Sequence, residues 1–225
     1  MTDTRLVPPR QLGLPLRRAR VFRREDFVVG PSNRDSVTAL DDWSGGALAL
    51  FGPAGVGKSH LAQVWASRQS AVTNPHTVEG LNGKSVLLED VDQGVDEEEL
   101  FHLLNLADQP GGSLLLTART PPATWVVKLP DLRSRLNAMP VCQIQEPDDQ
   151  VLEGALRLFF AERSIRPPED VYGYLVWRME RSIPAAREIV RKLDELAIGD
   201  SRAITRLLAR QILEDRSQNI DLFDR

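Results

Sequence analysis

One short glycine-rich segment constrains this 225-residue chain more than any other feature. Residues 52–59 read Gly-Pro-Ala-Gly-Val-Gly-Lys-Ser, which fits the pattern G-x-x-x-x-G-K-S/T. The apolar run 47–51 precedes the segment, and residues with helical character follow it. A strand, a glycine loop and a helix in this order form a phosphate-binding loop, because the glycines let backbone N–H groups converge on phosphate oxygens. A chance match in a chain of this length has a probability of only about 1%, so the sequence predicts a nucleotide site.

The residues of this loop have distinct chemical roles. Lys58 would reach the β- and γ-phosphates, and the Ser59 hydroxyl would hold Mg²⁺. The start of the following helix adds a partial positive charge at the same point. We therefore expect ADP or ATP, with Mg²⁺, as the cofactors. The nucleotide contacts expected here are Gly52, Gly55, Gly57, Lys58, Ser59 and His60.

Two acidic residues complete the predicted site. Glu89 and Asp90 follow the apolar segment 85–88, where a nucleotide-binding sheet places the acids that hold Mg²⁺ and orient the attacking water. We expect Glu89 and Ser59 to bind the Mg²⁺ ion that accompanies the nucleotide. Because the first acid at this place is usually Asp, the longer Glu89 side chain leaves the efficiency of hydrolysis open. The alternative interpretation is a pair of solvated acids at the end of a strand.

The composition is that of a globular protein, with 42% hydrophobic and 27% charged residues. The single Cys142 cannot form an intramolecular disulfide bond, and the three histidines have no cysteine partners at metal-binding spacing. The longest apolar runs have about five residues, whereas a helix that spans a bilayer needs ~20. No secretory segment is visible at the N-terminus. These features predict a soluble cytoplasmic protein without a membrane partner.

The formal charge of −4 is distributed unevenly along the chain. Residues 1–24 contain seven arginines and one aspartate, a net charge of +6, so residues 25–225 carry −10. An acidic body repels DNA phosphates, which argues against a broad DNA-binding surface. The arginine-rich tail is either a solvated linker or a DNA contact.

The chain divides into four segments of different sequence character. Residues 1–21 contain three prolines and no helical period, and they predict a flexible tail. Buried strands alternate with helices in residues 22–146, which predicts an α/β domain with a largely parallel sheet. Only helical patterns occur in residues 147–216, which predicts a small all-α domain, and residues 217–225 form a C-terminal tail.

Capping residues mark several predicted helix ends. Asp96 and Ser182 precede helical patterns and are candidate N-caps. Each cap would satisfy backbone N–H groups that the first helical turn leaves without a partner. Gly199 is expected to end one helix of the all-α domain, and Asp200 to cap the next helix, which would run to Arg216.

The order of these motifs resembles that of AAA+ ATPases, in which an α/β P-loop NTPase domain is followed by a helical lid. The more specific resemblance is to the Hda family, which is related to the replication initiator DnaA. It covers nearly the whole chain, and only residues 70–84 match weakly. Arg119 departs from the acidic residue common at its place in the initiator, which leaves the chemistry of that strand end open. Besides the phosphate-binding loop, the segments that carry the resemblance are Phe27–Asn33, Val86–Asp90, Leu115–Arg119, Asp131–Leu136 and Ile183–Glu188.

The resemblance implies roles for further residues. Val28 and Asn33 would contact the adenine side of the nucleotide, and Arg187 would contact phosphate from the lid. Arg135 would act as an arginine finger in the nucleotide site of a partner molecule, with Arg133 as a helper. The alternative interpretation of these arginines is a surface role, as helix cations or as ion-pair partners.

The N-terminal tail contains a second specific motif. Residues 11–16 read Gln-Leu-Gly-Leu-Pro-Leu and resemble the QL-x-LPL peptide with which the Hda family binds the β sliding clamp (DnaN). An extended peptide of this kind offers leucines to an apolar pocket, and its proline lowers the cost of ordering. The alternative is a linker rich in leucine and proline. A looser copy at 219–223 is either a second clamp contact or an apolar tail. The expected clamp contacts are Gln11, Leu12, Leu14 and Leu16.

The resemblance implies a regulator of replication initiation that associates with the replisome at the nucleoid. Such a protein binds the clamp and stimulates hydrolysis of the ATP bound to DnaA. Its association with DNA is indirect, through the clamp. Two other functions share the same motifs: a self-assembling AAA+ ATPase such as a helicase loader, and a DNA-binding scaffold. We expect weak or absent hydrolysis by the chain alone, whereas a self-assembling ATPase would hydrolyse ATP by itself. The sequence leaves a homodimer open.

Overall fold

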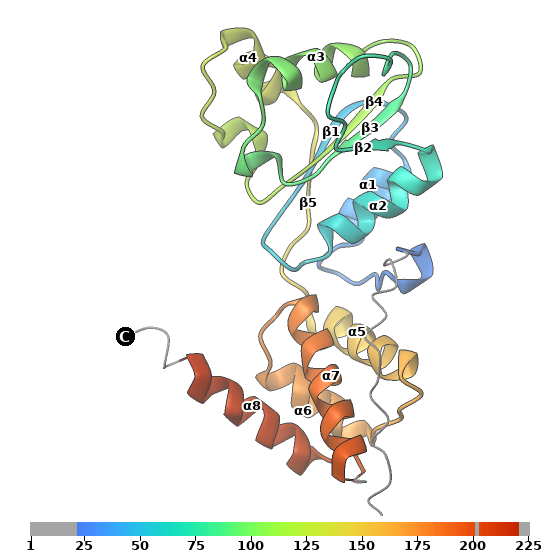
Figure 1. The fold of residues 1–225 in the computed structure, drawn as a ribbon, viewed down its shortest axis with the longest axis vertical. Helices are drawn as coiled ribbons and strands as arrows, with labels where there is room; N and C mark the ends of the chain where they lie inside the picture. Colours follow the sequence, from blue (N-terminus) through green and yellow to red (C-terminus); the bar gives the residue numbers. More distant parts are fainter. Residues whose placement is uncertain (1–21, 201–202, 221–225) are drawn as a thin grey trace, which may run out of the picture.

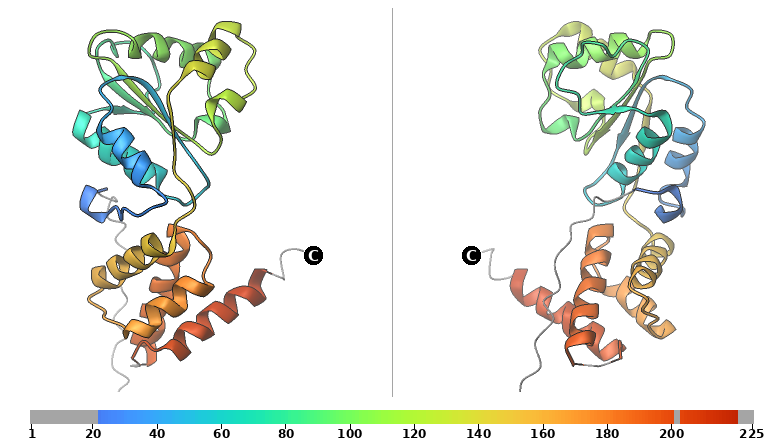
Figure 2. Two further views of the ribbon diagram at one scale, coloured as in Figure 1. Left: turned by 180° about the vertical axis from the view of Figure 1, so that it is seen from behind. Right: turned by 45° about the vertical axis from the view of Figure 1, so that its right-hand side comes forward.

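The computed structural model describes residues 22–200 and 203–220. Within this part, an α/β body and a helical lid lie one above the other (Figure 1), and the chain passes from body to lid after the last strand (Figure 2). The expected clamp peptide at 11–16 lies outside the described residues, as do residues 221–223 of its looser copy. No helix in the described ranges is both long enough and apolar enough to cross a bilayer.

The described part contains five strands and eight α-helices, and its strands all belong to the body. The strands are β1 (Gly46–Phe51), β2 (Val72–Thr73), β3 (Ser85–Leu88), β4 (Ser113–Ala118) and β5 (Val141–Gln143). The helices of the body are α1 (Arg34–Asp41), α2 (Lys58–Gln69), α3 (Glu97–Ala107) and α4 (Pro130–Ala138), with 3-10 turns η1 (Arg24–Asp26), η2 (Val91–Gln93) and η3 (Pro122–Thr124). The lid consists of α5 (Asp149–Glu162), α6 (Glu169–Arg178), α7 (Ile183–Asp200) and α8 (Arg206–Ile220).

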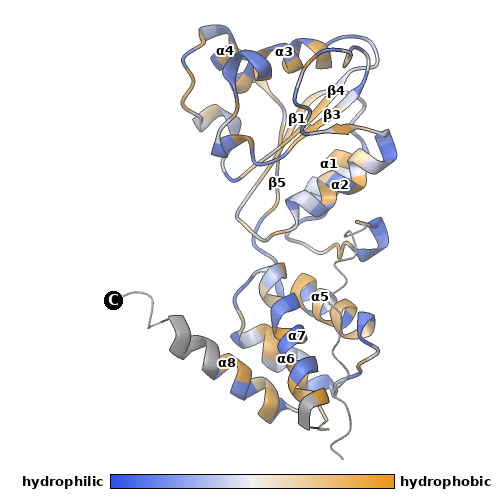
Figure 3. Cartoon of the chain, viewed as in Figure 1, coloured by the Kyte–Doolittle hydropathy of each residue, from blue (hydrophilic) through white to orange (hydrophobic). Residues whose placement is uncertain are grey.

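The strands form one sheet in the order β2-β3-β4-β1-β5, and every pair is parallel. β1 lies between β4 and β5, and its residues Ala49 and Leu50 are fully buried. Helices α1 and α2 cover one face of the sheet, and α3 and α4 cover the other (Figure 1). A parallel sheet needs helical crossovers that bury both of its faces, which is why its strands are mostly apolar (Figure 3). The predicted α/β class with a parallel sheet is confirmed.

Local capping explains where two of the helices start. Asp96 precedes α3, and its carboxylate accepts a hydrogen bond of 2.9 Å from the N–H of Glu99. The hydroxyl of Ser182, before α7, accepts a hydrogen bond of 3.3 Å from the N–H of Ala185. Each acceptor satisfies an N–H group that lacks a partner within its helix. Both predicted N-caps are therefore confirmed.

One predicted helix boundary in the lid is wrong. α7 continues through Gly199 to Asp200, so Asp200 does not cap the next helix. α8 starts at Arg206 instead, with the Thr205 hydroxyl as acceptor for a backbone N–H of its first turn, and it ends four residues beyond the expected position. A glycine in a helix costs only about 1 kcal/mol, and α7 ends one residue after Gly199.

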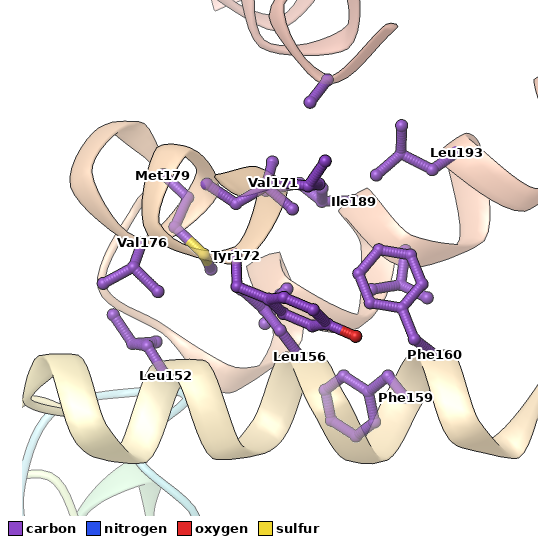
Figure 4. Close-up of a cluster of buried hydrophobic side chains, with 14 of the residues drawn as sticks. Leu152, Leu156, Phe159, Phe160, Val171, Tyr172, Val176, Met179, Ile189 and Leu193 are labelled. Carbon is purple, nitrogen blue, oxygen red and sulfur yellow. The ribbon is translucent and has the colours of Figure 1, made fainter. Parts of the chain in front are cut away.

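The lid has a hydrophobic core of its own. α5, α6 and α7 meet around aromatic side chains, and the rings of Phe160 and Tyr172 pack edge to face with centroids 5.7 Å apart (Figure 4). Ile189 and Leu193 of α7 belong to the same buried cluster. Apolar and polar residues alternate along the lid helices (Figure 3), because each helix buries only one side. This core holds α5 and α7 in the positions from which they reach the body.

Candidate nucleotide-binding site

The phosphate-binding loop connects β1 to α2, and its backbone geometry requires glycine. Gly52, Gly55 and Gly57 have φ angles of 151°, 77° and 104°, in a region that residues with a Cβ rarely adopt. A Cβ on Gly52 would also lie 2.1 Å from the carbonyl oxygen of Ile144. The loop therefore curls tightly against its surroundings and ends at Lys58, the first residue of α2.

Lys58 lies within this loop with little access to solvent. It is 7% exposed, and its Nζ donates hydrogen bonds of 2.7 Å to the carbonyl oxygens of Gly52 and Pro53. Burial lowers the pKa of the ammonium group, although the carboxylates of Asp90 and Asp92 oppose this effect. The result is a buried cation whose hydrogen-bond partners are neutral, so it fits the negative charge of a phosphate group.

A cavity of about 730 Å³ opens at the loop, between the body and the lid helices α5 and α7. This volume lies within the range of roughly 300–1,000 Å³ that is usual for small-molecule sites. Gly52 and Glu89 are the two predicted nucleotide-site residues that do not line it. The predicted residues that the cavity brings together are Val28, Asn33, Gly55, Gly57, Lys58, Ser59, His60, Asp90 and Arg187.

The expected adenine side of the cavity is built by the segment before α1. Asn33 is 3% exposed, and its side chain accepts a hydrogen bond from a loop N–H and donates one to the Val28 carbonyl oxygen, both over 2.9 Å. Asn33 therefore shapes the loop that presents Val28 to the cavity. The His60 ring lies edge-on to Phe22 and Phe27, with centroids 5.3 Å and 5.4 Å away. These rings and Val28 give the cavity an apolar wall of the kind that suits a base.

Arg187 reaches the cavity from the lid. The first residue of α7, Ile183, donates a backbone hydrogen bond of 3.0 Å to the carbonyl oxygen of Gly55 in the loop. One turn further on, the Arg187 guanidinium lies 3.9 Å from the ring centroid of Phe159 and donates a 3.0 Å hydrogen bond to Glu162. Since the side chains of this ion pair are 34% and 37% exposed, a phosphate oxygen can replace the carboxylate at small cost.

The two predicted acids have different surroundings. Asp90 lines the cavity, its φ angle is 54°, and its N–H donates a hydrogen bond of 3.0 Å to the Thr117 hydroxyl. Glu89 does not line the cavity, and its carboxylate instead accepts a hydrogen bond of 2.7 Å from Gln63 Nε2 of α2. The cavity thus brings together Ser59 and Asp90, whereas the Glu89 carboxylate is bound to Gln63.

Solved structures of other proteins share this architecture. No protein-family model matches the chain. Domain III of the replication initiation protein DnaA from Thermotoga maritima matches 85% of this chain and 95% of its own, with a TM-score of 0.71 and 20% identity. The chain has the AAA+ P-loop fold.

Two further solved structures share the AAA+ fold. AMPPCP-bound DnaA from Aquifex aeolicus matches with a TM-score of 0.66 and 18% identity over 90% of this chain and 71% of that one. The RuvB Holliday junction branch migration motor from Thermotoga maritima matches with a TM-score of 0.64 and 15% identity over 87% and 72%. At these identities the similarity shows a common fold, and the activity has to be argued from the site.

In this AAA+ fold the predicted finger arginines lie outside the cavity, on α4 at the end of the body remote from the lid (Figure 1). The Arg135 side chain is 37% exposed, forms a 2.7 Å ion pair with Asp108 and lies over the ring of Phe101. Arg133 is half-buried and donates a hydrogen bond of 2.5 Å to the carbonyl oxygen of Trp125. Arg135 thus has an accessible guanidinium, and Arg133 supports the loop before α4.

The partners of two of the candidate site residues were not evident from the sequence. Gln63, which binds Glu89, and Glu162, which binds Arg187, belong to no motif. The one signal for Gln63 is its position four residues after Ser59, which places both on one side of α2. Glu162 has no such signal, because it meets its partner only through the packing of α5 against α7.

Proposed function

We propose that this chain regulates the initiation of DNA replication by inactivating the initiator DnaA. In this proposal it holds ADP or ATP in its own cavity and binds the β sliding clamp through residues 11–16. Its Arg135 then enters the nucleotide site of DnaA and stimulates hydrolysis of the ATP bound there. The chain would act at the replisome and meet DNA only through the clamp.

The position of Arg135 is the observation that carries this proposal. α4 places it on the surface, at the end of the body remote from its own cavity. It therefore cannot serve the nucleotide of its own chain, but it can approach the nucleotide of another molecule. Its ion pair with Asp108 is exposed on both sides, and such a pair is worth at most about 1 kcal/mol, so a phosphate can replace the carboxylate.

Arginine suits this role because its planar guanidinium stays charged and donates two parallel hydrogen bonds to phosphate oxygens. Beside a partner's γ-phosphate it stabilises the charge that develops during phosphoryl transfer. For arginine fingers this effect is on the order of 10³–10⁵ in rate. Arg133 would help by holding the loop before α4 through the Trp125 carbonyl group.

The chain's own residues would hold its nucleotide as a structural element. Lys58 and the loop N–H groups would bind the β-phosphate, Arg187 would contact phosphate from the lid, and Val28 would lie beside the base. Mg²⁺, bound with the nucleotide at Ser59, would neutralise part of the phosphate charge. Because these contacts come from both the body and the lid, a bound nucleotide would set the angle between them.

The test follows phosphate release from ATP-bound DnaA in the presence of clamp loaded on DNA. The wild type should stimulate release, and Arg135→Ala should reduce the stimulation about 10³-fold or more while it retains ADP and clamp binding. Arg68→Ala is a matched control, because Arg68 is also a surface arginine in an ion pair, with Asp41 over 2.9 Å. Equal stimulation by the wild type and Arg135→Ala would rule out the finger.

The clamp interaction has a separate test. The double substitution Gln11→Ala with Leu14→Ala should abolish the clamp complex and leave the melting temperature unchanged, because the sequence predicts a flexible tail for residues 1–21. Unchanged clamp affinity in this variant would refute the assignment of the peptide. Truncation of Leu222 and Phe223 to alanine tests the looser copy in the same assay.

A self-assembling AAA+ ATPase is the second candidate, and the similarity to the RuvB motor favours it. In that case Arg135 would serve a neighbouring copy of the same chain. Intrinsic ATP hydrolysis that rises steeply with protein concentration would support this function. Hydrolysis that requires added DnaA and clamp would support the first one.

A further inference from the structure

The lid exposes a group of aromatic, arginine and leucine side chains that no part of the proposed function uses. α6 and α8 lie side by side, and the Arg206 guanidinium of α8 lies 4.8 Å from the ring centroid of Tyr174 on α6. The neighbouring side chains of Trp177 and Leu207 are 78% and 77% exposed. We call this surface the lid patch, and it consists of Tyr174, Trp177, Arg178, Arg206 and Leu207.

The two arginines of the lid patch have aromatic rings as partners instead of carboxylates. The Arg178 guanidinium lies 4.9 Å from the ring centroid of Tyr174 and 4.7 Å from that of Trp177. Among the residues that the structure describes, neither Arg178 nor Arg206 forms an ion pair. Six other arginines in the described part of the lid each pair with a carboxylate, namely Arg157, Arg163, Arg181, Arg187, Arg191 and Arg210.

This difference leaves positive charge at the lid patch available to a partner. A guanidinium that stacks on a ring keeps its N–H groups at the edge free for an anion. Tyrosine, tryptophan and arginine are also the residues most enriched in protein interfaces. A single-stranded nucleic acid would use similar side chains, but residues 25–225 carry a net charge of −10, which repels a long polyanion. The patch therefore fits a short acidic peptide with apolar side chains.

The chain itself contains a peptide of this chemistry. Residues 221–224 read Asp-Leu-Phe-Asp, so two apolar side chains stand between two carboxylates. The exposed apolar groups of the lid patch and its unpaired guanidiniums are complementary to these two kinds of side chain. The sequence alone therefore supplies an occupant of matching charge and hydrophobicity.

This segment cannot cover the whole lid patch of its own chain. α8 leads away from the other lid helices (Figures 1 and 2). With a rise of ~1.5 Å per residue, its last residue, Ile220, lies about 20 Å from Leu207 in its first turn. Leu222 and Phe223 follow so closely in the sequence that they reach at most about 10 Å beyond Ile220. Contact with Leu207 therefore has to come from another molecule.

We propose that residues 221–224 of one copy bind the lid patch of a second copy, so that two copies exchange these segments in a symmetric dimer. The apolar side chains of the segment would cover Trp177 and Leu207. Its carboxylates would pair with Arg178 and Arg206. Because each copy supplies one segment and one patch, a two-fold axis closes the assembly and leaves neither without a partner. This inference goes beyond the proposed function and depends on neither nucleotide nor clamp.

Sedimentation equilibrium of the full chain tests the inference through a charge swap. The wild type should show a concentration-dependent equilibrium between monomer and dimer. The patch variant, Arg178→Glu with Arg206→Glu, should raise the dimer dissociation constant about 100-fold, because like charges then face each other. The segment variant, Asp221→Arg with Asp224→Arg, should raise it by a similar factor. An equimolar mixture of the two variants should associate as the wild type does, since both contacts of a mixed dimer then pair opposite charges.

A control variant separates this pairing from a general effect of net charge. Arg34→Glu with Arg166→Glu changes the net charge by the same amount as the patch variant. Both arginines are exposed and lie outside the lid patch, so this variant should dimerise as the wild type does. Thermal unfolding should be the same in all variants, which excludes misfolding as the cause of a loss.

Tryptophan fluorescence locates the contact. All four tryptophans lie in the described part of the chain, and Trp177 is the exposed one. Its burial in the dimer should shift the emission to shorter wavelength as the protein concentration rises, and Trp177→Phe should remove the shift. A synthetic peptide of residues 219–225, added to wild type dilute enough to be monomeric, should produce the same shift. The peptide should produce none with the patch variant.

Three outcomes would overturn the inference. The first is a wild type that stays monomeric at every concentration. The second is equal association of the wild type and the patch variant, or a mixture of the two variants that does not associate. The third is an emission shift on adding oligothymidylate to the wild type but none on adding the peptide, which would assign the lid patch to nucleic acid.

Discussion

The two cations at the centre of the proposed function, Lys58 and Arg135, lie in opposite surroundings. Lys58 is 7% exposed, bonded to two carbonyl oxygens of its own loop, and part of a cavity between body and lid. Arg135 is 37% exposed and lies at the other end of the body, where it forms an ion pair with the surface carboxylate of Asp108. In the proposed function the buried cation holds a phosphate within the chain, whereas the exposed one acts on the nucleotide of a second molecule. One AAA+ fold can therefore separate holding a nucleotide from acting on one.

Removing each cation in turn should have the largest effects and tests whether the two have separate roles. Lys58→Ala should weaken ADP binding by about 100-fold, because charged hydrogen bonds to phosphate are lost inside the cavity. Arg135→Ala should change ADP affinity by less than about twofold, since it lies outside the cavity. Calorimetric titration measures both affinities. Similar losses in the two variants would contradict the separation.

A smaller effect is expected at the lid. Arg187→Ala should weaken ADP binding by about tenfold, less than Lys58→Ala, because Arg187 is one-third exposed and must exchange Glu162 for phosphate. The same titration measures it. Arg210→Ala, which removes an exposed arginine of α8 paired with Glu214, serves as the control. A loss in the control as large as in Arg187→Ala would show that the lid contributes only through its net charge.

The junction of body and lid depends on Asp148. Its carboxylate accepts hydrogen bonds from the N–H groups of Val151 over 3.0 Å and Ser32 over 2.7 Å, which ties α5 to the segment before α1. Burial raises the pKa of this carboxyl group, but the hydrogen bonds outweigh burial, and the pKa lies below its ordinary value. Asp148→Ala should therefore lower the free energy of unfolding at neutral pH by about 1–2 kcal/mol.

The pH dependence of this effect has a defined sign. Because the folded-state pKa is lowered, the contribution of Asp148 is fully present above the unfolded-state pKa of about 3.9. It is lost as the pH falls through the folded-state value. Urea unfolding should show that the difference between wild type and Asp148→Ala shrinks under acidic conditions. Asp148→Asn keeps an acceptor oxygen, so its free energy of unfolding at neutral pH should differ less from that of the wild type. If the wild type remains more stable than Asp148→Ala at acidic pH by the same amount, the assignment is wrong.

The smallest effect is expected at the exposed end of the body. Asp108→Asn removes the ion-pair partner of Arg135, and it should change the free energy of unfolding by less than about 0.5 kcal/mol. Stimulation of DnaA should stay equal or rise, because the guanidinium no longer has to leave a carboxylate. Thermal unfolding and phosphate release measure the two effects. Loss of stimulation in Asp108→Asn would mean that the pair orients Arg135 rather than competing for it.

Much of the body could be predicted because its rules are local. The glycines at 52, 55 and 57 are required by the φ angles of one short loop, and Asp96 caps a helix through a residue three positions away. Apolar strands that alternate with helices lead to a parallel sheet. The start of α8 at Arg206 was not predicted, because Thr205 rather than Asp200 supplies the hydroxyl or carboxylate acceptor for its first turn.

The sequence by itself determined the phosphate-binding loop and the order of strands and helices, since these depend on neighbouring residues. Only the tertiary structure decided that Asp90 lines the cavity while Glu89 is bound by Gln63. It also decided that Arg187 meets Glu162, and that Arg135 lies far from its own nucleotide site. These relations depend on how segments distant in the chain pack against one another, and no local spacing encodes that packing.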